Sequence, residues 1–297
     1  MKITSLGCGN AFSTVNGNNC FLLEDGYEHN GTVRKLLIDA GWALPYMLQK
    51  SQVSVKDITD VYVSHAHADH IGGLEYLAFS RYDFVNKPQF APNGSPCLIG
   101  NPALLKDVWE KSLRGGMESL EGIDCTLETY FKVKSIEPHK HFEWCGWDCR
   151  LVQQIHIMTG SMITNTFGII MKKEGHQTVY FVTDSQHCSP HQAEVFYKEA
   201  DVIFQDTELI GVDCKDPANR EMKFCSHVHA NYGQLAGLKG ANSTILPMEI
   251  RNKMWLTHYQ DFMMWNKDFF GNDYLWAMGA KADGFQGFVH VGQTWEV

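Results

Sequence analysis

The chain has 297 residues, 44% of them hydrophobic and 20% charged, which is enough apolar material for a large buried core. Its formal net charge is −9, from 34 acidic and 25 basic residues without a Lys/Arg cluster, and this balance disfavours a protein whose main task is to hold duplex DNA or folded RNA. No apolar run is long enough to cross a bilayer, and the first residues, MKITSLGCG, do not follow the pattern of a signal peptide, so we expect a cytoplasmic protein.

The first part of the chain reads as a series of strands interrupted by one helix. Apolar patterning predicts a helix over 43–52 and strands over 2–7, 19–23, 35–41 and 60–65. The glycine-bearing loop after the first strand is a poor match to a dinucleotide-binding fingerprint, because Phe12 occupies the position of its third glycine. The last of these strands leads directly into the stretch HAHADH.

The rest of the chain reads as helices and a second series of strands. A helix is predicted over 71–82, a Pro- and Gly-rich loop over 83–101, and a helix over 101–120 that a Gly-Gly pair breaks. Strands are then predicted over 129–136, 148–157, 166–173, 178–184, 200–206 and 253–261, and helices over 191–200, 232–240 and 247–254. Two series of strands with interspersed helices predict the α/β class, as an αββα sandwich that forms a single domain over residues 1–297.

Nine cysteines in a chain without an export signal indicate reduced thiols rather than a disulfide framework. Cys145 and Cys149 are the closest pair, and with His139 and His141 just upstream they could form a structural zinc site. Their spacing is not that of a standard zinc knuckle, and a hairpin with its turn near Gly146 explains the segment as well. We therefore favour the hairpin.

The stretch HAHADH, from His65 to His70, places three imidazoles and a carboxylate directly after a buried strand. Because side chains alternate along a strand, His65 and His67 point to the same side and can reach one metal ion. Asp69 and His70 follow after the chain turns into the next helix, so they can face a neighbouring position. The motif therefore predicts two ions a few ångströms apart, an arrangement that clamps a phosphoryl centre for in-line attack.

Further ligands are expected at the ends of other strands, because one turn cannot complete two coordination shells. Asp184 ends the strand TVYFVTD, where a carboxylate is well suited to bridging two cations. His258 ends the strand predicted in KMWLTHYQD, and His156 lies within or just after LVQQIHI. Asp39, at the end of LLID, is a candidate for orienting a ligating imidazole. Each histidine alone would be an ordinary core or surface residue, but together with HAHADH they favour a metal site.

The pattern H-x-H-x-D-H after a strand resembles the signature of the metallo-β-lactamase superfamily, and the likeness runs from SLGCGNAF through LLIDAG, HAHADH, VTD and LTHY. The opening GCGNAF with NNCFLLE is more similar to the branch of tRNA 3′-processing endonucleases and cyclic-nucleotide phosphodiesterases than to the lactamases. Closer still are the phage-borne anti-Pycsar proteins, which destroy cyclic mononucleotide signals. The chain resembles them in GGMESL, in SHVHANYGQL with LPMEIRNKMWLTHY, and in the ending KADGFQGFVHVGQTWEV.

The resemblance implies two zinc ions and seven ligands. One zinc would be bound by His65, His67 and His156, and the other by Asp69, His70 and His258, with Asp184 bridging the two. Zinc fits such a set of imidazoles and carboxylates, although Mn²⁺ or iron can occupy similar sites. The segment after His156 is longer than in the endonucleases, so His139 or His141 could be the ligand instead.

The resemblance also implies the catalytic residues. Water activated by the two ions would be the nucleophile, and Asp69 would be catalytic as well as a ligand. The leaving ribose oxygen needs a proton, which a histidine on a separate loop donates in the endonucleases. Here SHVHANY offers His227 and His229, and we favour His229, which is followed by Ala and a helix. No residue is predicted to bind the substrate base.

A helical insertion of about residues 88–122 is the expected lid. Its apolar residues Trp109, Leu113, Met117 and Leu120 read individually as helix core, whereas the resemblance implies a lid that packs across a homodimer over the partner's active site. A closed, water-poor pocket suits a small cyclic nucleotide. The chain also lacks the basic arm with which the endonucleases grip tRNA.

The resemblance thus implies a dinuclear-zinc phosphodiesterase that hydrolyses 3′,5′-cyclic mononucleotides, such as cCMP, cUMP, cAMP and cGMP, to nucleoside 5′-monophosphates and so evades antiphage signalling. One alternative is a tRNA 3′-end processing endonuclease, which would require a basic surface and salt-dependent binding. A second is a metal-free binding module, against which stands the presence of every expected ligand. Lactone or thioester hydrolysis would use the same metal core with a different pocket.

Overall fold

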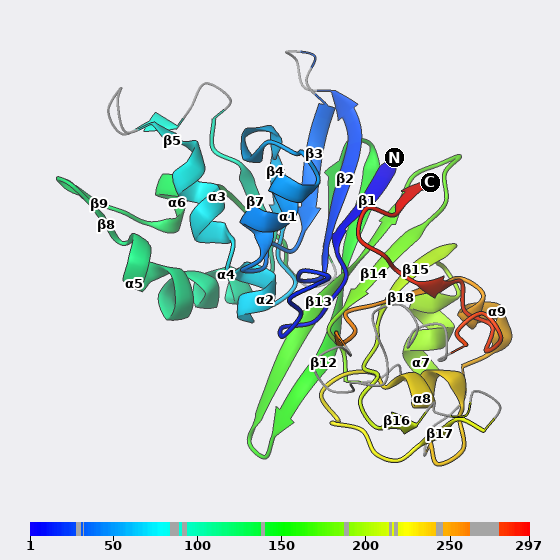
Figure 1. Cartoon of the computed structure of the whole chain (residues 1–297). Helices are drawn as coiled ribbons and strands as arrows, with labels where there is room; N and C mark the ends of the chain where they lie inside the picture. Colours follow the sequence, from blue (N-terminus) through cyan, green and yellow to red (C-terminus); the bar gives the residue numbers. More distant parts are fainter. Residues whose placement is uncertain are drawn as a thin grey trace. The chain divides into compact units, whose positions relative to one another are not determined.

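The computed structural model describes residues 1–27, 31, 33–83, 89–90, 94–137, 140–186, 190–213, 216, 219–241, 246–261 and 279–297. The chain divides into two compact units, whose elements are labelled in Figure 1. The first unit comprises Met1–Gly7, Gly17–Gly146 and Val291–Val297, and the second comprises Cys8–Asn16 and Trp147–His290. Each unit combines a mixed β-sheet with helices, so the predicted α/β class is confirmed, while the single domain with a lid over 88–122 stays a prediction.

The first unit is built on a mixed sheet. Its strands are β1 (Lys2–Gly7), β2 (Cys20–Tyr27), β3 (Val33–Ile38), β4 (Asp60–Tyr62), β7 (Cys97–Gly100), β10 (Lys132–Ser135) and β20 (Thr294–Glu296), in the order β10-β7-β4-β3-β2-β1-β20. The pairs from β20 to β3 are antiparallel, and those from β3 to β10 are parallel. The carboxyl ends of β3 and β4 therefore meet at one edge, where Asp39 N donates a hydrogen bond to Tyr62 O (2.9 Å).

Short helices and hairpins connect these strands. The helices are α1 (Leu44–Lys50), a 3₁₀ turn (Val55–Asp57), α2 (Ala68–Ile71), α3 (Leu74–Arg81), α4 (Pro102–Val108), a π-helical turn (Trp109–Leu113), α5 (Arg114–Met117) and α6 (Leu127–Tyr130). Two hairpins pair β5 (Tyr82–Asp83) with β6 (Gln89–Phe90) and β8 (Ser119–Leu120) with β9 (Ile123–Asp124), and a further strand, β11, spans His141–Trp144. Asn101 caps α4, because its side-chain oxygen accepts a hydrogen bond from Ala103 N (3.0 Å).

Several of the predicted elements of this unit are wrong in part. The segment 83–101 is not only loop, because CLIG forms β7 between β4 and β10; four apolar residues do not stand out as a strand until their neighbours in the sheet are known. The helix predicted over 71–82 begins earlier, as α2, and is interrupted at Gly72 and Gly73 before α3.

The helix predicted over 101–120 is not broken at its glycines. It passes through Gly115 and Gly116 as α5, although glycine disfavours a helix interior. Two side chains of this helix, Leu113 and Met117, are buried in the first unit, and Tyr130 Oη donates a hydrogen bond to Met117 O (2.8 Å). Their burial is what the helix-core interpretation of the segment predicts, and it offsets the cost of the glycines.

The second unit contains the long hairpin of β12 (Trp147–Thr159) and β13 (Met162–Lys172), which is prominent in Figure 1. The sheet continues with β14 (Val179–Thr183), β15 (Val202–Asp206), β18 (Met254–Thr257) and β19 (Gly287–Phe288), in the order β12-β13-β14-β15-β18-β19. β12, β13 and β14 are antiparallel neighbours, and β14, β15, β18 and β19 are parallel. The carboxyl ends of β14, β15 and β18 therefore lie side by side.

The helices of the second unit are short. They are α7 (Pro190–Gln192), which continues as a π-helical turn (Ala193–Tyr197), α8 (Tyr232–Ala236) and α9 (Met248–Arg251), and a small hairpin joins β16 (Val212–Asp213) to β17 (Glu221–Met222). Asn231 caps α8 by accepting a hydrogen bond from Gly233 N (2.8 Å), and Gly237 ends it in the left-handed conformation. No helix in the parts of the chain that the structure describes is long and apolar enough to span a membrane.

Each sheet has its own apolar core, as the alternating and continuous apolar runs predict. Ile3, Leu36 and Val61 are completely buried in the first unit. In the second unit Phe181 and Phe204 stack with their ring centroids 4.9 Å apart. Burial of each such side chain stabilises the fold by about 1.5–3 kcal/mol, so both sheets are firm supports for the polar loops at their carboxyl edges.

Candidate metal and catalytic site

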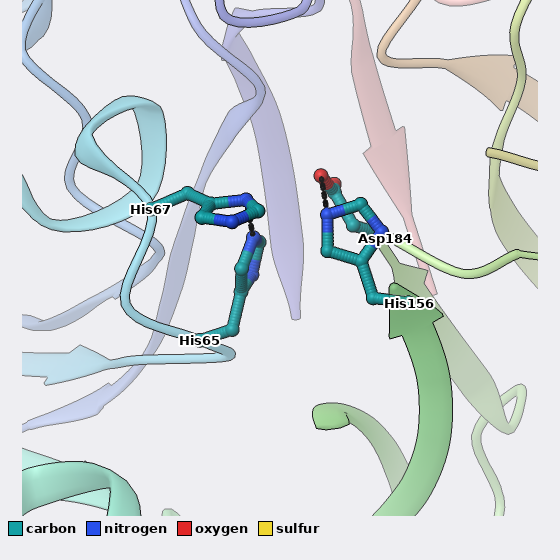
Figure 2. A group of neighbouring side chains, drawn as sticks. All are labelled: His65, His67, His156 and Asp184. Carbon is teal, nitrogen blue, oxygen red and sulfur yellow. Dashed lines mark hydrogen bonds and ion pairs between the residues drawn. The ribbon is translucent and has the colours of Figure 1, made fainter. Parts of the chain in front are cut away.

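The loop between β4 and α2 holds the first pair of predicted ligands. His65 is buried and His67 half-buried, and Nε2 of His65 lies 3.0 Å from Nδ1 of His67. Figure 2 shows the two rings side by side, with a dashed line between these nitrogens. Two imidazole nitrogens that converge in this way can bind the same cation, as the alternation of the motif predicts.

The second pair, Asp69 and His70, lies in the first turn of α2. Both are buried, and Nε2 of His70 is 3.3 Å from Oδ2 of Asp69. The other ring nitrogen of His70, Nδ1, is held by Oδ2 of Asp39 at 2.7 Å, so Nε2 is the nitrogen that could bind a metal ion. Asp39 also accepts hydrogen bonds from Ser64 N (2.8 Å) and Ser64 Oγ (2.7 Å), which fixes the start of the loop. The predicted orienting role of Asp39 therefore has a geometric basis.

Two glycines allow the segment after β3 to pack against α2. A Cβ atom at Gly41 would lie 1.9 Å from the carbonyl oxygen of Asp69, and one at Gly73 would lie 2.5 Å from the carbonyl oxygen of Gly41. Both contacts are with backbone, which cannot move aside as a side chain can. Close backbone approach, rather than an unusual φ angle, is what requires glycine here.

In the second unit, Asp184 follows β14 and is faced by two imidazoles. Its Oδ1 lies 3.3 Å from Nε2 of His258, and its Oδ2 lies 3.5 Å from Nε2 of His156. Figure 2 shows the dashed contact between His156 and Asp184. A carboxylate whose two oxygens each face a different ligating nitrogen has the geometry of a bridge between two cations, the role that the sequence suggested.

His156 owes its direction to a β-bulge. In the pairing of β12 with β13, Ile155 and Ile157 face consecutive residues, so His156 is the extra residue of the bulge. Bulges re-aim side chains next to functional sites. Nδ1 of His156 donates a hydrogen bond to Val228 O (3.0 Å), which leaves Nε2 toward Asp184.

Asp206, which ends β15, is a residue that the sequence analysis missed. It is completely buried, with Oδ2 2.9 Å from Nδ1 of His229 and Oδ1 3.3 Å from Nδ1 of His258. The carboxylate of Asp206 thus faces Nδ1 of both imidazoles, so that Nε2 of each ring points to other groups. The signal was present, because VIFQD is a buried strand that ends in an acid, as do LLID and VYFVTD.

The charges in this cluster shift each other's titration. Burial would raise the pKa of Asp206, but His229 and His258 outweigh it and hold the pKa below its usual value. Burial would likewise lower the pKa of His229, but Asp206 and then Asp184 outweigh it and raise the pKa. The cationic form of His229 is therefore stabilised.

The structure separates His229 from its neighbour His227. His227 is exposed, and its Nδ1 contacts Cys225 Sγ (3.3 Å) rather than a carboxylate. His229 is mostly buried beside Asp206. This contrast supports the preference for His229 as the proton donor.

Three residues at or next to the carboxyl ends of strands have a strained backbone. Asp39, Thr183 and His258 have φ angles of 63°, 60° and 61°, in the left-handed region that favours glycine. Each costs about 1–2 kcal/mol, and a β-branched residue such as Thr183 is especially disfavoured. Each of these three residues is itself a predicted ligand, adjoins one or contacts one, so the surrounding contacts hold the predicted ligands in place against this cost.

The predicted site residues thus fall into two clusters. The first unit holds His65, His67, Asp69 and His70 with Asp39, and the second holds His156, Asp184, His229 and His258 with Asp206. One donor atom each from Asp184, Asp206, His229 and His258 lie within 4.8 Å of one another. Buried imidazoles and carboxylates in such numbers fit a divalent transition metal such as zinc. Of the alternative ligands, His141 is exposed on β11 and His139 lies outside the described residues.

The alternative zinc site at Cys145 and Cys149 is better explained as a hairpin. Cys145 and Gly146 form the turn between β11 and β12, both with positive φ angles (52° and 78°). Cys145 Sγ donates a hydrogen bond to Asp25 O (3.4 Å), and Cys149 Sγ donates one to Trp147 O (3.5 Å). Both sulfurs therefore donate to backbone carbonyl oxygens, which the hairpin explains without a metal ion.

Comparison with known proteins identifies the family to which these clusters belong. A family model described as Anti-Pycsar protein Apyc1 matches residues 1–295. Curated proteins of that description include one from Paenibacillus harenae, 29% identical over 266 residues that cover 88% of this chain and 90% of the relative. Another, from Bacillus phage BSP38, is 29% identical over 279 residues that cover 91% of each chain.

Solved structures show the same fold. Zinc-bound PqqB from Methylobacterium extorquens superimposes with a TM-score of 0.67 at 14% identity and covers all of both chains. The metallo-β-lactamase fold protein YhfI from Bacillus subtilis has a TM-score of 0.62 at 18% identity, over 100% of this chain and 98% of the other. Human short-form tRNase Z has a TM-score of 0.61 at 16% identity, over 100% of this chain and 99% of the other. The predicted metallo-β-lactamase fold is confirmed.

Proposed function

The chain belongs to the Anti-Pycsar protein Apyc1 family, and from this premise we propose that it is a metal-dependent phosphodiesterase. Its substrates would be 3′,5′-cyclic mononucleotides, which it would hydrolyse to nucleoside 5′-monophosphates. The family description supports a role in removing the cyclic nucleotides of an antiphage signal. A homodimer and a location in the cytoplasm belong to the same proposal.

The ligands proposed for two divalent cations come from both clusters. His65, His67 and His156 would hold one ion, Asp69, His70 and His258 the other, and Asp184 would bridge them. When bound, such ions supply Lewis-acid stabilisation of phosphoryl oxygens and lower the pKa of a water molecule to about 7. The orienting contacts of His70 with Asp39 and of His156 with Val228 O support this assignment, because ligating imidazoles are typically fixed through their second nitrogen.

The observation that carries the proposal is the pairing of His229 with Asp206 beside Asp184. Nδ1 of His229 is held by Asp206 at 2.9 Å, so Nε2 is the nitrogen that can hand a proton to a substrate. In hydrolysis of a cyclic diester, a P–O bond to water forms as the P–O3′ bond breaks, and the ribose O3′ takes the proton from His229 Nε2. The water leaves its OH on the phosphate and releases its other proton to solvent, from which His229 is protonated again. Asp206 stabilises the cationic imidazole before the transfer and keeps the ring oriented after it.

The proposal is tested by turnover with purified protein of known metal content. The substrates are 3′,5′-cyclic CMP, UMP, AMP and GMP beside a precursor tRNA, each with and without a chelator. We expect about two zinc ions per chain and chelator-sensitive formation of 5′-monophosphates, identified by chromatography against the 3′-isomers. Cleavage of the tRNA with the cyclic nucleotides left intact would assign the endonuclease activity instead. Absence of metal and of turnover would leave the binding module.

A further inference from the structure

The residues that follow β18 are bonded to the loop Cys8–Asn16, which belongs to the same unit. His258 N donates a hydrogen bond to Cys8 O (2.8 Å), and Asn10 N donates one to Tyr259 O (3.2 Å). Gly9 and Tyr259 form a parallel bridge between these two hydrogen bonds. The loop therefore acts as a short extra strand against the backbone of His258.

This loop is fixed in turn by one buried carboxylate, that of Asp261. Its Oδ1 accepts hydrogen bonds from Ser13 Oγ (2.8 Å) and Asn16 Nδ2 (2.7 Å). Its Oδ2 accepts hydrogen bonds from Thr14 N and Val15 N, both at 2.7 Å. Four consecutive residues thus surround a single side chain that is 6% exposed. Hydrogen bonds to a charged acceptor are stronger than neutral ones, so Asp261 defines the shape of the turn.

A continuous chain of contacts joins this turn to His258. Asn16, which donates to Asp261 through its side chain, accepts a hydrogen bond from Cys8 N through its carbonyl oxygen (3.1 Å). Cys8 then holds His258 N through its own carbonyl oxygen. Two hydrogen bonds of one residue, Cys8, thus connect the turn to the predicted ligand.

We propose that Asp261 is a positioning residue for His258, a role that rests on the proposed metal-dependent function. The φ angle of His258 is 61°, a conformation that a non-glycine residue keeps only under restraint. When the turn loosens, Cys8 O no longer fixes His258 N, and the backbone relaxes toward an ordinary φ angle. The imidazole then leaves its place between Asp184 and Asp206, and the cation loses a well-oriented nitrogen.

The test is the affinity of the metal-free protein for Zn²⁺, measured by competition with a chromogenic chelator. Asp261→Ala removes the acceptor of all four hydrogen bonds, and we expect the affinity of the weaker-bound ion to fall about tenfold, as for other residues that orient metal ligands. Asp261→Asn keeps one acceptor oxygen for the two backbone N–H groups, and we expect a smaller loss. If Asp261→Ala does not fold, the zinc affinities of Asp261→Asn and Ser13→Ala test the same role.

Asp283→Ala is the matched control. Asp283 is a mostly buried carboxylate of the same unit that accepts hydrogen bonds from Arg220 Nη2 (2.7 Å) and Tyr232 Oη. We expect it to lower the melting temperature while the zinc affinity stays that of the parent protein. Equal zinc affinity in Asp261→Ala and the parent would overturn the proposal, and so would an equal loss in Asp283→Ala.

A second readout separates this role from the proposed function. If the parent protein binds no zinc, the metal-dependent function fails, but the position of His258 can still be followed by imidazole NMR in the metal-free protein. We expect the His258 signals to shift and broaden in Asp261→Ala and to be retained in Asp283→Ala. Unchanged His258 signals in Asp261→Ala would overturn the positioning role by itself.

Discussion

The two ligand clusters are built in opposite ways. In the first unit, four predicted ligands come from the six residues His65 to His70, and local geometry sets their directions. In the second, residues between His156 and His258 are gathered by the parallel register of β14, β15 and β18 and by a bulge in β12. The first arrangement depends on a turn and the second on a whole sheet. A sequence motif is therefore enough to identify the residues of the first cluster, whereas those of the second are recognised as neighbours only once the fold is known.

The supports of the two clusters differ as well. Asp39 orients one predicted ligand, His70, and the loop that carries the motif. Asp206 faces one predicted ligand, His258, and the predicted proton donor, His229. Loss of the first carboxylate should therefore affect metal binding, whereas loss of the second should affect both metal binding and proton transfer.

The largest effect is expected when either cluster loses a ligand. His67→Ala in the first unit and Asp184→Ala in the second should each lower turnover of cyclic nucleotides by about 10³-fold or more, because several kcal/mol of transition-state stabilisation come from the ions and each 1.36 kcal/mol is tenfold in rate. Metal content measured with turnover checks this. Full activity in one variant alone would show that its cluster is dispensable.

His229→Ala is expected to have the next largest effect, about 10³-fold on kcat, with unchanged metal content. The reason is the loss of the proton for the leaving O3′. A diester with a p-nitrophenyl leaving group needs no such proton, so its hydrolysis should fall much less. An equal loss on both substrates would contradict the role of proton donor, and His227→Ala is the matched control, with near-parent rates on both.

The two supporting carboxylates can be compared directly with Asp206→Asn and Asp39→Asn. Each substitution should lower the affinity for zinc about 10–100-fold. We expect Asp39→Asn to weaken zinc affinity and to leave kcat of the reloaded enzyme nearly intact, since Asn tolerates the left-handed conformation at that position. Asp206→Asn should lower both quantities. Zinc titration and kcat at saturating metal separate the two cases, and identical patterns would remove the distinction between the clusters.

Gly41→Ala should have the smallest effect on turnover per metal-loaded molecule and a clear effect on stability. The added Cβ would meet the backbone of Asp69 at 1.9 Å, so the two segments must separate, at a cost of about 1–3 kcal/mol. Thermal denaturation of the metal-free protein measures this. Gly115→Ala, where a Cβ meets no atom within 4 Å, is the matched control and should be neutral or stabilising.

The sequence predicted the apolar strands and the acids or histidines at their ends, because both follow from local patterns. It missed Asp206: VIFQD ends in an acid as LLID and VYFVTD do, but the role of this acid depends on His229 and His258, which only the fold brings to face it. It also missed β7, whose four residues become a strand through pairing with β4 and β10. What escaped prediction was in each case set by partners distant in the chain.

Gly41 and Gly73, which lie in close contact with backbone, are required for a different reason than the predicted metal ligands. A predicted ligand serves only the chemistry, whereas these glycines serve the shape of the loop, because a Cβ added at either position would force backbone segments apart. A relative that lacks histidines of HAHADH but has both glycines would then keep this loop without the proposed metal chemistry. A relative that lacks the glycines as well would have to form this edge of the sheet in a different way.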